Sequence, residues 1–556
     1  MKMTGGQALA HSLRIEGIDT LFTLPGIQLD YFFDALWEIK DEFTIFHTRH
    51  EQATGYMADG YSRSTGKPSG FIVVPGPGVL NTTAALSTSY ACSSPVVCIT
   101  GQIDSHLIDQ GVGALHEIND QVGLLAHLTK LSERGETPGE IPAMMRRASR
   151  AIQEGRPRPV SVEVSPDVLA TVADVTLLEP ETINHRNAAD IDSDLIEEAA
   201  KLLGNAESPV ICAGGGVLTA EAWEEVNELS EILGAPVLMT SNGRGIVDER
   251  TPRGLSGRFP TNELVPNADV ILAIGTRFSM ASNMGLGGGV TVTGKLIQCD
   301  VDGDEIGRNY PTEIALQSDA KLTTAALCEA LRAHNKKRVS RDAELSDLKD
   351  RQTAGMAGMT WQAGMSGAIR EVLPEDGIVV SESTQVGYFV QGGGFPVYKP
   401  RSFFTSGYQG TLGYGYPTAL GVQVGNPDKV VVSVNGDGGF MYNVQELSTQ
   451  AQYDIPLITL VFNDGLFGNV RRIQEQKYNG HSMSTDLNNP DFAALAELFG
   501  VTGYQVQSAA ELKTTLSRAI ADRKPALIEV QQPRTPDLAS PFPMQQEPPR
   551  PVVELI

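Results

Sequence analysis

The sequence predicts an α/β protein built from doubly wound parallel sheets. Short apolar runs rich in β-branched residues alternate along the whole chain with stretches of helical pattern. Most of these runs are continuously apolar rather than alternating, as in strands that helices cover on both faces. We therefore predict strands at 71–74, 96–100, 160–164, 210–213, 270–274, 429–434 and 457–462.

Two polar stretches divide the 556 residues into three segments. Residues 177–194 and 334–359 are typical of connections between domains, although the second can also contain a surface helix. A chain of this length predicts about three or four domains. We place three, at 1–176, 190–335 and 358–535, followed by a proline-rich and mostly irregular tail at 536–556. The first and third segments each contain a strand, a glycine turn and a helix-like stretch at similar spacing, which hints at two related domains.

The composition excludes several classes of partner. With 43 basic and 67 acidic residues the formal net charge is -24, which disfavours a nucleic acid or an anionic membrane as partner. Five scattered cysteines without a Cys-x-x-Cys pair disfavour disulfides and zinc, and they predict a reducing cytoplasm. We expect neither a secretion signal nor a membrane span. A phosphorylated ligand would then need backbone N–H groups or a divalent cation.

The strongest motif combines two acidic turns. Gly436-Asp437-Gly438-Gly439 follows one predicted strand, and Asn463-Asp464-Gly465 follows the next. Because neighbouring parallel strands end at the same edge of a sheet, we expect Asp437 and Asp464 to converge beside glycines that admit a phosphate. A helix should begin near Asn443. Two carboxylates beside a phosphate suit Mg²⁺, and the alternative is a pair of ordinary Asp-Gly turns.

The stretch 436–464 resembles the cofactor motif of the thiamine-diphosphate-dependent enzymes, in which Gly-Asp-Gly is followed, beyond a helix and a strand, by Asn-Asn or Asn-Asp. The resemblance implies thiamine diphosphate and Mg²⁺ as cofactors. It makes Asp437, Asp464 and the carbonyl of Leu466 the metal ligands. The family more often has Asn at the second position, so Asp464 is a departure that adds one negative charge.

A second segment supports the first from the other end of the chain. Arg49-His50-Glu51-Gln52 and the following GYMADGYSRSTGKP are similar to a motif of the acetolactate synthase branch of that family. By this resemblance Glu51 is the carboxyl group that hydrogen-bonds the aminopyrimidine ring and so promotes loss of the thiazolium C2 proton. Without the resemblance, Glu51 is only an acid in the first turn of a helix.

The same resemblance assigns the remaining cofactor contacts. Residues 405–417 are similar to a family segment in which a bulky residue, here Leu412, bends the cofactor. The backbone of Gly410 and Leu412 would bond the pyrimidine, and residues 383–385 would contact the diphosphate. The full predicted set is Pro25, Pro75, Asn81, Ser383, Thr384, Gln385, Gly410, Leu412, Gly436, Gly438, Gly439, Leu466, Phe467 and Gly468.

The resemblance covers nearly the whole chain and gives each segment a role. It implies a pyrimidine-binding domain, a central Rossmann-like domain and a diphosphate-binding domain. It also implies a homodimer at least, and commonly a homotetramer, because the cofactor lies between Glu51 of one subunit and the Asp437 site of another. In the central domain, residues 210–217, residues 275–278, Asp300 and Asp319 match positions where the synthases bind FAD. FAD, ADP and an empty structural domain remain alternatives.

Two further residues are catalytic candidates. By the resemblance Gln28 faces the reactive carbon, and His116 replaces a glutamine of the synthases on a pocket wall. We assign His116 to proton transfer or substrate orientation, although a lone histidine is more often structural. Ile473 replaces the tryptophan by which the branched-chain synthases select their second substrate, which disfavours a dedicated biosynthetic acetohydroxyacid synthase.

These observations predict an enzyme, a transferase or lyase. It would decarboxylate a small, pyruvate-like 2-oxo acid and act as a carboligase towards an aldehyde or ketone. The alternative on the same fold is a lyase or hydrolase that cleaves a C–C bond of a 2-hydroxyketone or a cyclic diketone. A third hypothesis, a non-catalytic cofactor-binding protein, is disfavoured because every catalytic element is present.

Overall fold

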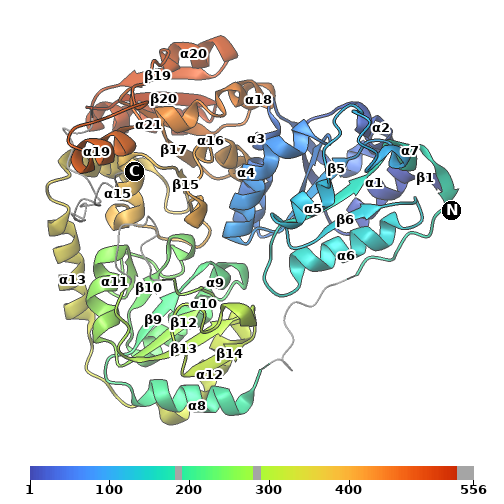
Figure 1. Cartoon of the computed structure of the whole chain (residues 1–556). Coiled ribbons are helices and arrows are strands. Elements are labelled where there is room, and N and C mark those ends of the chain that lie inside the picture. Colours follow the sequence, from blue (N-terminus) through green and yellow to red (C-terminus); the bar gives the residue numbers. More distant parts are fainter. Residues whose placement is uncertain (182–190, 280–289, 535–556) are drawn as a thin grey trace, which may run out of the picture.

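The computed structural model describes residues 1–181, 191–279 and 290–534, so the predicted tail at 536–556 lies outside the described residues. Three six-stranded sheets, each entirely parallel, form three α/β domains (Figure 1). All seven predicted strands are present, with ends that shift by at most two residues. The predicted fold class is therefore confirmed. None of the described helices is long and apolar enough to cross a membrane.

The N-terminal sheet has the strand order β3-β2-β4-β5-β7-β6. Its strands are β2 Thr20–Thr23, β3 Thr44–His47, β4 Ser69–Val73, β5 Val96–Gly101, β6 Ser132–Gly135 and β7 Val160–Val164. Its helices are α1 Gly5–Ile15, α2 Asp30–Glu38, α3 Glu51–Thr65, α4 Pro77–Cys92, α5 Gln121–Ala126, α6 Ile141–Gln153 and α7 Pro166–Ala170. A separate antiparallel pair joins β1 Lys2–Thr4 to β8 Val172–Asp174.

The central sheet has the order β11-β10-β9-β12-β13-β14. Its strands are β9 Val210–Ala213, β10 Val237–Met239, β11 Gly254–Ser256, β12 Val270–Ile274, β13 Lys295–Asp300 and β14 Ile314–Gln317. Its helices are α8 Ser193–Asn205, α9 Gly215–Thr219, α10 Trp223–Leu233, α11 Arg258–Leu264 and α12 Ala320–His334. In chain order the strands run 3-2-1-4-5-6, the Rossmann order. The connection that follows contains the surface helix α13 Asp342–Gly355.

The C-terminal sheet has the order β16-β15-β17-β18-β20-β19. Its strands are β15 Ile378–Ser381, β16 Phe403–Phe404, β17 Val431–Gly436, β18 Ile458–Asn463, β19 Thr502–Val506 and β20 Ala526–Gln531. Its helices are α14 Thr360–Val372, α15 Gln385–Phe389, α16 Gly415–Gly425, α17 Asp437–Phe440, α18 Leu447–Gln452, α19 Gly468–Lys477, α20 Phe492–Phe499 and α21 Ala509–Asp522. In chain order, the first and third sheets both run 2-1-3-4-6-5, so the two domains share one topology.

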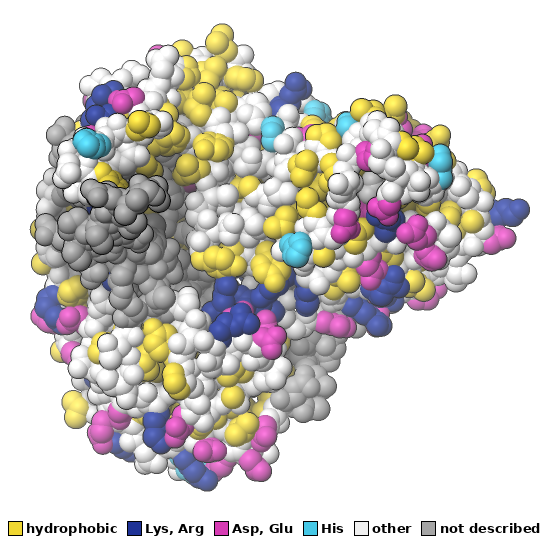
Figure 2. All heavy atoms as spheres, in the orientation of Figure 1, with side chains coloured by type: hydrophobic (Ala, Val, Ile, Leu, Met, Phe, Trp, Pro, Cys, Tyr) yellow, Lys and Arg dark blue, Asp and Glu magenta, His cyan; other side chains and the backbone are white. Residues whose placement is uncertain are grey.

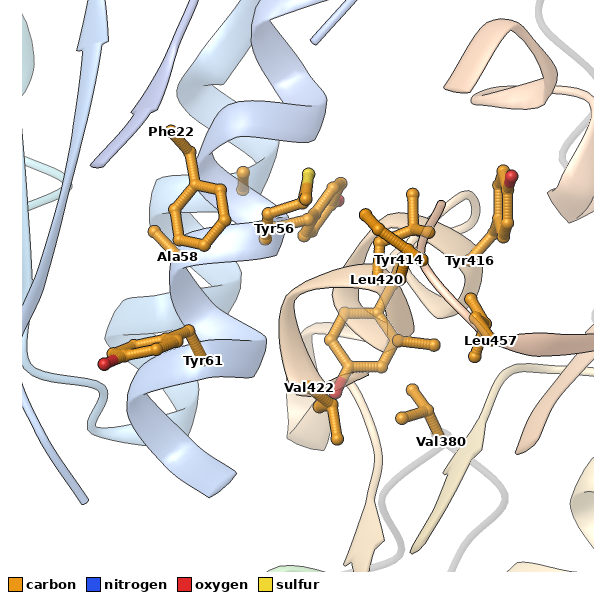
Figure 3. Close-up of a cluster of buried hydrophobic side chains, with 14 of the residues drawn as sticks. Phe22, Tyr56, Ala58, Tyr61, Val380, Tyr414, Tyr416, Leu420, Val422 and Leu457 are labelled. Atoms are coloured by element: carbon orange, nitrogen blue, oxygen red, sulfur yellow. The ribbon is translucent and has the colours of Figure 1, made fainter. Parts of the chain in front are cut away.

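The first and third domains meet through α3 and α16. A Cβ atom on Gly60 would lie 2.1 Å from the Thr418 carbonyl oxygen, and one on Gly421 would lie 1.9 Å from that of Met57, so glycines allow the close approach of the helices. Figure 3 shows side chains of α3 facing those of α16 and its flanking residues in one buried cluster. This contact fixes the N-terminus of α3 relative to the C-terminal domain.

One arginine of α3 contacts all three domains. The Arg63 guanidinium donates to the Tyr414 hydroxyl at 2.8 Å and to the Thr405 carbonyl at 3.0 Å, both in the C-terminal domain. It also donates to the side-chain oxygen of Asn242 in the central domain at 3.2 Å. Its ion pair with the buried Asp59 at 3.2 Å supplies the opposite charge that a buried guanidinium requires.

Candidate functional site

The carboxyl edge of the C-terminal sheet brings the two acidic turns together. β17 ends at Gly436, and its parallel neighbour β18 ends at Asn463, one residue before Asp464. Asp437 and Asp464 are nearly buried, with 2% and 8% of their surfaces exposed. Burial, and secondly the charge of Asp464, raises the pKa of Asp437 to about 6. The two carboxylates therefore converge at this edge.

A helical segment begins at Val444 with Asn443 as its N-cap residue, as predicted, but a short helix that was not predicted precedes it. This helix, α17, begins at Asp437, with the extended Gly436 as its N-cap residue. An acidic residue at the first helical position is favourable because it faces the positive end of the helix dipole. A 3₁₀ turn at Val444–Glu446 then leads into α18.

Polar groups from later in the chain surround the two carboxylates. Asp437 accepts a hydrogen bond from the side-chain amide of Asn489 at 2.6 Å. Asp464 accepts one from the Leu466 N–H at 3.1 Å and one from the side-chain amide of Gln532 at 2.9 Å. Sequence reasoning missed Asn489 and Gln532 because no local motif marks them.

The donor set at this edge suits a magnesium ion. Among the described residues no group of three or more His, Cys, Asp and Glu side chains could hold a metal. A cation here would therefore use two carboxylates, a backbone carbonyl and oxygen atoms from outside the protein, as Mg²⁺ commonly does. Two like charges in a buried site also favour a cation that neutralises them.

The glycine turn packs tightly beside this pair. A Cβ atom on Gly436 would lie 3.4 Å from the Thr384 side chain and 3.6 Å from the Ser383 carbonyl oxygen, so these segments adjoin. A Cβ atom on Gly438 would lie 2.6 Å from the ring of Phe467, the residue before α19. Gln385 begins α15, and its buried side-chain oxygen has no hydrogen-bond partner in the described part of the chain. A side chain at position 438 would clash with Phe467, so this part of the turn requires glycine.

Leu412 lies in a loop with a defined shape. Gly410 and Gly413 on either side have φ values of 62° and 81°, in the left-handed region that favours glycine. The Thr411 and Thr88 hydroxyls, the latter on α4 of the N-terminal domain, share a hydrogen bond at 2.6 Å. Leu412 itself is only partly buried, so its side chain remains accessible to a ligand.

Glu51 is the first residue of α3, as predicted. The ring of His50 caps the helix by accepting from the Gln52 N–H at 3.1 Å. The Glu51 carboxylate accepts a hydrogen bond from the side-chain amide of Asn81 on α4 at 3.0 Å. The structure therefore brings together two residues that the sequence assigned to the cofactor separately.

A buried carboxylate of the C-terminal domain holds the segment before Glu51. Glu446 is fully buried and accepts from the backbone N–H groups of Arg49 and His50 at 3.0–3.2 Å. The Thr449 hydroxyl donates to the same carboxylate at 2.6 Å. Sequence reasoning missed this contact, which fixes the start of α3 to the domain that contains the acidic turns.

The Glu446 carboxyl makes stability depend on pH. Burial raises its pKa above the ordinary 4.5, against the effect of its hydrogen bonds. Protonation then favours the folded state, so this stabilisation is complete below the unfolded pKa and is lost as pH rises. We expect the melting temperature of the wild type to fall relative to that of Glu446→Gln as the pH rises above the ordinary pKa of 4.5, measured by calorimetry without ligands. The exposed Glu198→Gln is the control, and parallel curves for wild type and Glu446→Gln would contradict the expectation.

Gln28 and His116 form a hydrogen-bonded pair. The Gln28 amide nitrogen donates to the Leu115 carbonyl at 3.1 Å, which leaves its oxygen to accept from Nδ1 of His116 at 3.1 Å. The proton therefore lies on Nδ1 in the neutral ring, and Nε2 can accept a proton or a hydrogen bond. His116 has a φ of 69°, which is uncommon for a residue with a side chain.

The loop after β4 lies against this pair. Pro75 precedes Gly76, and a Cβ atom on Gly76 would lie 2.4 Å from the His116 carbonyl oxygen. The Gly76 N–H donates to the buried side chain of Gln121 at 3.1 Å. Pro25 follows β2 in the neighbouring loop. The candidate residues thus form two groups, one at the carboxyl edge of each outer sheet.

A cavity of about 810 Å³ lies between the three domains. It opens at the carboxyl edge of the central sheet, where the strand order reverses between β9 and β12, the usual ligand position in this topology. The glycines after these two strands and the predicted Asp300 and Asp319 all line it. Five arginines also line it, against three acidic residues. Figure 2 shows basic side chains gathered where the central and N-terminal domains meet.

The chain matches three family models in the order of its domains. Residues 3–124 match the N-terminal TPP-binding domain of thiamine pyrophosphate enzymes, residues 196–327 the central domain, and residues 385–530 the C-terminal TPP-binding domain.

Curated relatives match over nearly the full length. A probable acetolactate synthase large subunit of Methanocaldococcus jannaschii is 33% identical, with 95% of this chain and 92% of the relative covered. A probable 2-ketoarginine decarboxylase of Pseudomonas aeruginosa is 32% identical, with 95% and 94% covered. The large subunit of acetolactate synthase isozyme 3 of Escherichia coli is 30% identical, with 93% and 92% covered.

Proposed function

The chain belongs to the thiamine pyrophosphate enzyme family, and from this premise we propose that it decarboxylates a small, pyruvate-like 2-oxo acid and joins the remaining acyl unit to an aldehyde or ketone. The observation that carries the proposal is that both halves of a cofactor site are complete in one chain. Glu51 with Asn81 forms one half, and the acidic pair beside the glycine turn forms the other. The acetolactate synthases among the relatives support the reaction class.

We assign the cofactor to these residues as follows. Mg²⁺ would be held by Asp437, Asp464 and the Leu466 carbonyl, and the diphosphate would lie along residues 436–439 and 383–385. Glu51 would hydrogen-bond the aminopyrimidine ring, and Leu412 would contact the cofactor and keep it bent. When bound, thiamine diphosphate supplies a carbon centre that accepts the electron pair released by C–C cleavage. The residues of the chain orient it, exclude water and exchange protons.

The two halves meet in a homodimer in this proposal, with a homotetramer as the larger assembly. Exposed apolar side chains flank both halves. Ile27, Leu80 and Leu115 are exposed beside Gln28, Asn81 and His116 in the N-terminal domain, and Met441, Tyr442 and Val470 are exposed beyond the acidic turns. Apolar surface next to polar site residues is typical of a face that another protein surface covers. A second copy would cover it and complete the site.

The Gln28–His116 pair would act on the substrate. With its Nδ1 proton fixed by Gln28, His116 can donate to or accept from a substrate oxygen through Nε2. We expect His116→Ala to lower kcat by about 10²-fold, measured by steady-state kinetics, with thiamine diphosphate affinity unchanged. The exposed His106 in the preceding turn is the matched control, and His106→Ala should retain activity. Equal rates for the two variants would remove His116 from the mechanism.

A substrate screen tests the function as a whole. The holoenzyme is incubated with pyruvate, benzoylformate or glyoxylate, with and without acetaldehyde and a second 2-oxo acid, and the products are identified. Release of CO₂ with formation of a hydroxyketone or acetohydroxy acid supports the proposal. Cleavage of acetoin, benzoin or cyclohexane-1,2-dione without decarboxylation of any 2-oxo acid would instead favour the lyase or hydrolase that the Gln28–His116 pair also fits.

The central cavity would bind a nucleotide, either FAD or ADP. Its volume lies within the range of ligand pockets, and its lining has more basic than acidic residues in a protein whose net charge is -24. The test is to release bound small molecules by heat from the purified protein and to identify them by absorbance and chromatography. The assignment fails if no nucleotide is released and neither FAD nor ADP binds on titration.

A further inference from the structure

The fully buried carboxylate of Glu382 has no role in the chemistry described so far. We propose that Glu382 is a positioning residue that holds the loop at residues 410–415 in the shape that presents Leu412 to thiamine diphosphate. The inference rests on the proposed function. Glu382 follows β15 directly, and its N–H donates to the Val434 carbonyl of β17 at 2.9 Å, so its backbone belongs to the rigid sheet.

The two carboxylate oxygens hold one end of the loop. One accepts from the Gly413 N–H at 2.6 Å and the other from the Gly415 N–H at 3.3 Å. The Gly413 carbonyl accepts from the side chain of Asn443 at 2.7 Å, so both polar groups of this left-handed residue are fixed. Leu412 precedes Gly413, and its direction therefore depends on these bonds.

The same carboxylate contacts the helix that begins with Asp437. A Cβ atom on Gly439 of α17 would lie 2.2 Å from a Glu382 oxygen, so the carboxylate packs directly against the bare helix backbone. Ser383 and Thr384, which adjoin the glycine turn, are the next two residues. One side chain thus sets the relative positions of the three segments assigned to the bend, the diphosphate and the metal.

The chemistry of this contact favours a positioning role. Burial raises the pKa of Glu382 to about 7, and only the N–H groups of Gly413 and Gly415 oppose that rise. A buried carboxylate that is satisfied by two backbone N–H groups costs stability compared with a neutral acceptor. Such a cost is typical of sites where geometry matters for function. A carboxylate offers two acceptors in a fixed plane, which a glutamine cannot do.

The test compares Glu382→Gln with wild type and with Glu382→Asp. The readouts are the affinity for thiamine diphosphate with Mg²⁺, the melting temperature, and the exchange rate of the cofactor C2 proton with solvent deuterium, followed by NMR. We expect Glu382→Gln to bind the cofactor with similar affinity but to exchange the C2 proton at least about ten-fold more slowly. The shorter aspartate should give an intermediate rate, since it keeps the charge but is displaced from Gly413.

Glu249→Gln is the matched control. The Glu249 carboxylate is also nearly buried and accepts from a backbone N–H, that of Val397, at 2.8 Å, but it lies between the central and C-terminal domains. The Glu249→Gln variant should have a lower melting temperature than wild type but exchange the cofactor C2 proton at the wild-type rate. If Glu382→Gln does not fold, Glu382→Asp is compared with wild type by the same measurements and by hydrogen exchange of residues 410–415.

The outcomes separate this inference from the proposed function. If both Glu382 variants exchange the cofactor C2 proton at the wild-type rate, the positioning role is overturned and the proposed function is unaffected. A wild-type protein that binds no thiamine diphosphate, or does not exchange its C2 proton, overturns the proposed function. Loss of folding, cofactor binding and exchange together in Glu382→Asp would make Glu382 a structural residue only, which also overturns the inference.

Discussion

Replacement of Glu51 by glutamine is expected to reduce turnover by about 10²- to 10⁴-fold while thiamine diphosphate remains bound. The Glu51 carboxylate is fixed at the first residue of α3 by the hydrogen bond from Asn81, and the segment before it is held by Glu446. A glutamine of nearly the same shape can still hydrogen-bond the aminopyrimidine ring of the cofactor but cannot exchange a proton with it. Steady-state kinetics with the best substrate of the screen, together with calorimetric titration of the cofactor, measure the two quantities separately.

The matched control for this prediction is Glu38→Gln. Glu38 is an exposed residue at the end of α2, and its replacement should leave kcat within about two-fold. Full activity in Glu51→Gln would mean that the carboxyl group does not take part in the reaction. Loss of cofactor binding in the same variant would assign it to binding rather than to proton exchange.

Replacement of Asp437 by alanine is expected to weaken Mg²⁺-dependent binding of thiamine diphosphate by more than about 100-fold. The variant leaves Asp464 as the only carboxylate of the proposed metal site, and it removes one of the two acceptors of the Asn489 side-chain amide, the other being the side-chain oxygen of Asn463. Calorimetric titration of the cofactor at fixed Mg²⁺ concentration measures the loss. The exposed Asp454→Asn, in the turn after α18, is the control.

Asp464→Asn should behave differently from the Asp437 variant. An amide oxygen can still ligate Mg²⁺, and the neutral side chain removes the charge repulsion that, after burial, is the second cause of the raised pKa of Asp437. We therefore expect cofactor affinity within about ten-fold of wild type. Equal and severe losses in both variants would show that the second negative charge is essential, and unchanged binding in Asp437→Ala would place the metal elsewhere.

Regular and local features of this chain could be predicted from its sequence. The seven predicted strands are buried on both faces, so continuous apolar runs identified all of them to within two residues, and some of the runs, such as 210–213 and 270–274, match to the residue. The convergence of Asp437 and Asp464 followed from the geometry of neighbouring parallel strands. Glu51 at the start of a helix followed from a local motif.

Contacts between distant parts of the chain could not be predicted in this way. Glu446 contacts the backbone of Arg49 and His50 across 397 and 396 residues, and Gln532 contacts Asp464 across 68. These partners are set by the packing of α3 against α16 and by strand pairing, neither of which leaves a local pattern. The short helix α17 was missed because the four glycine and aspartate residues at 436–439 are equally typical of a turn.

The packing of α3 against α16 also has a consequence for the unfolding of the chain. The buried cluster there includes Phe22, Tyr56 and Phe71 from before the central domain, and Tyr414 and Leu457 from after it. We therefore expect the outer domains to melt together, since neither can open without exposing apolar surface of the other. The core clusters of the central domain contain no residue of either outer sheet, so we expect this domain to melt as a second unit. The chain has three domains by topology, and we expect two melting transitions in calorimetry.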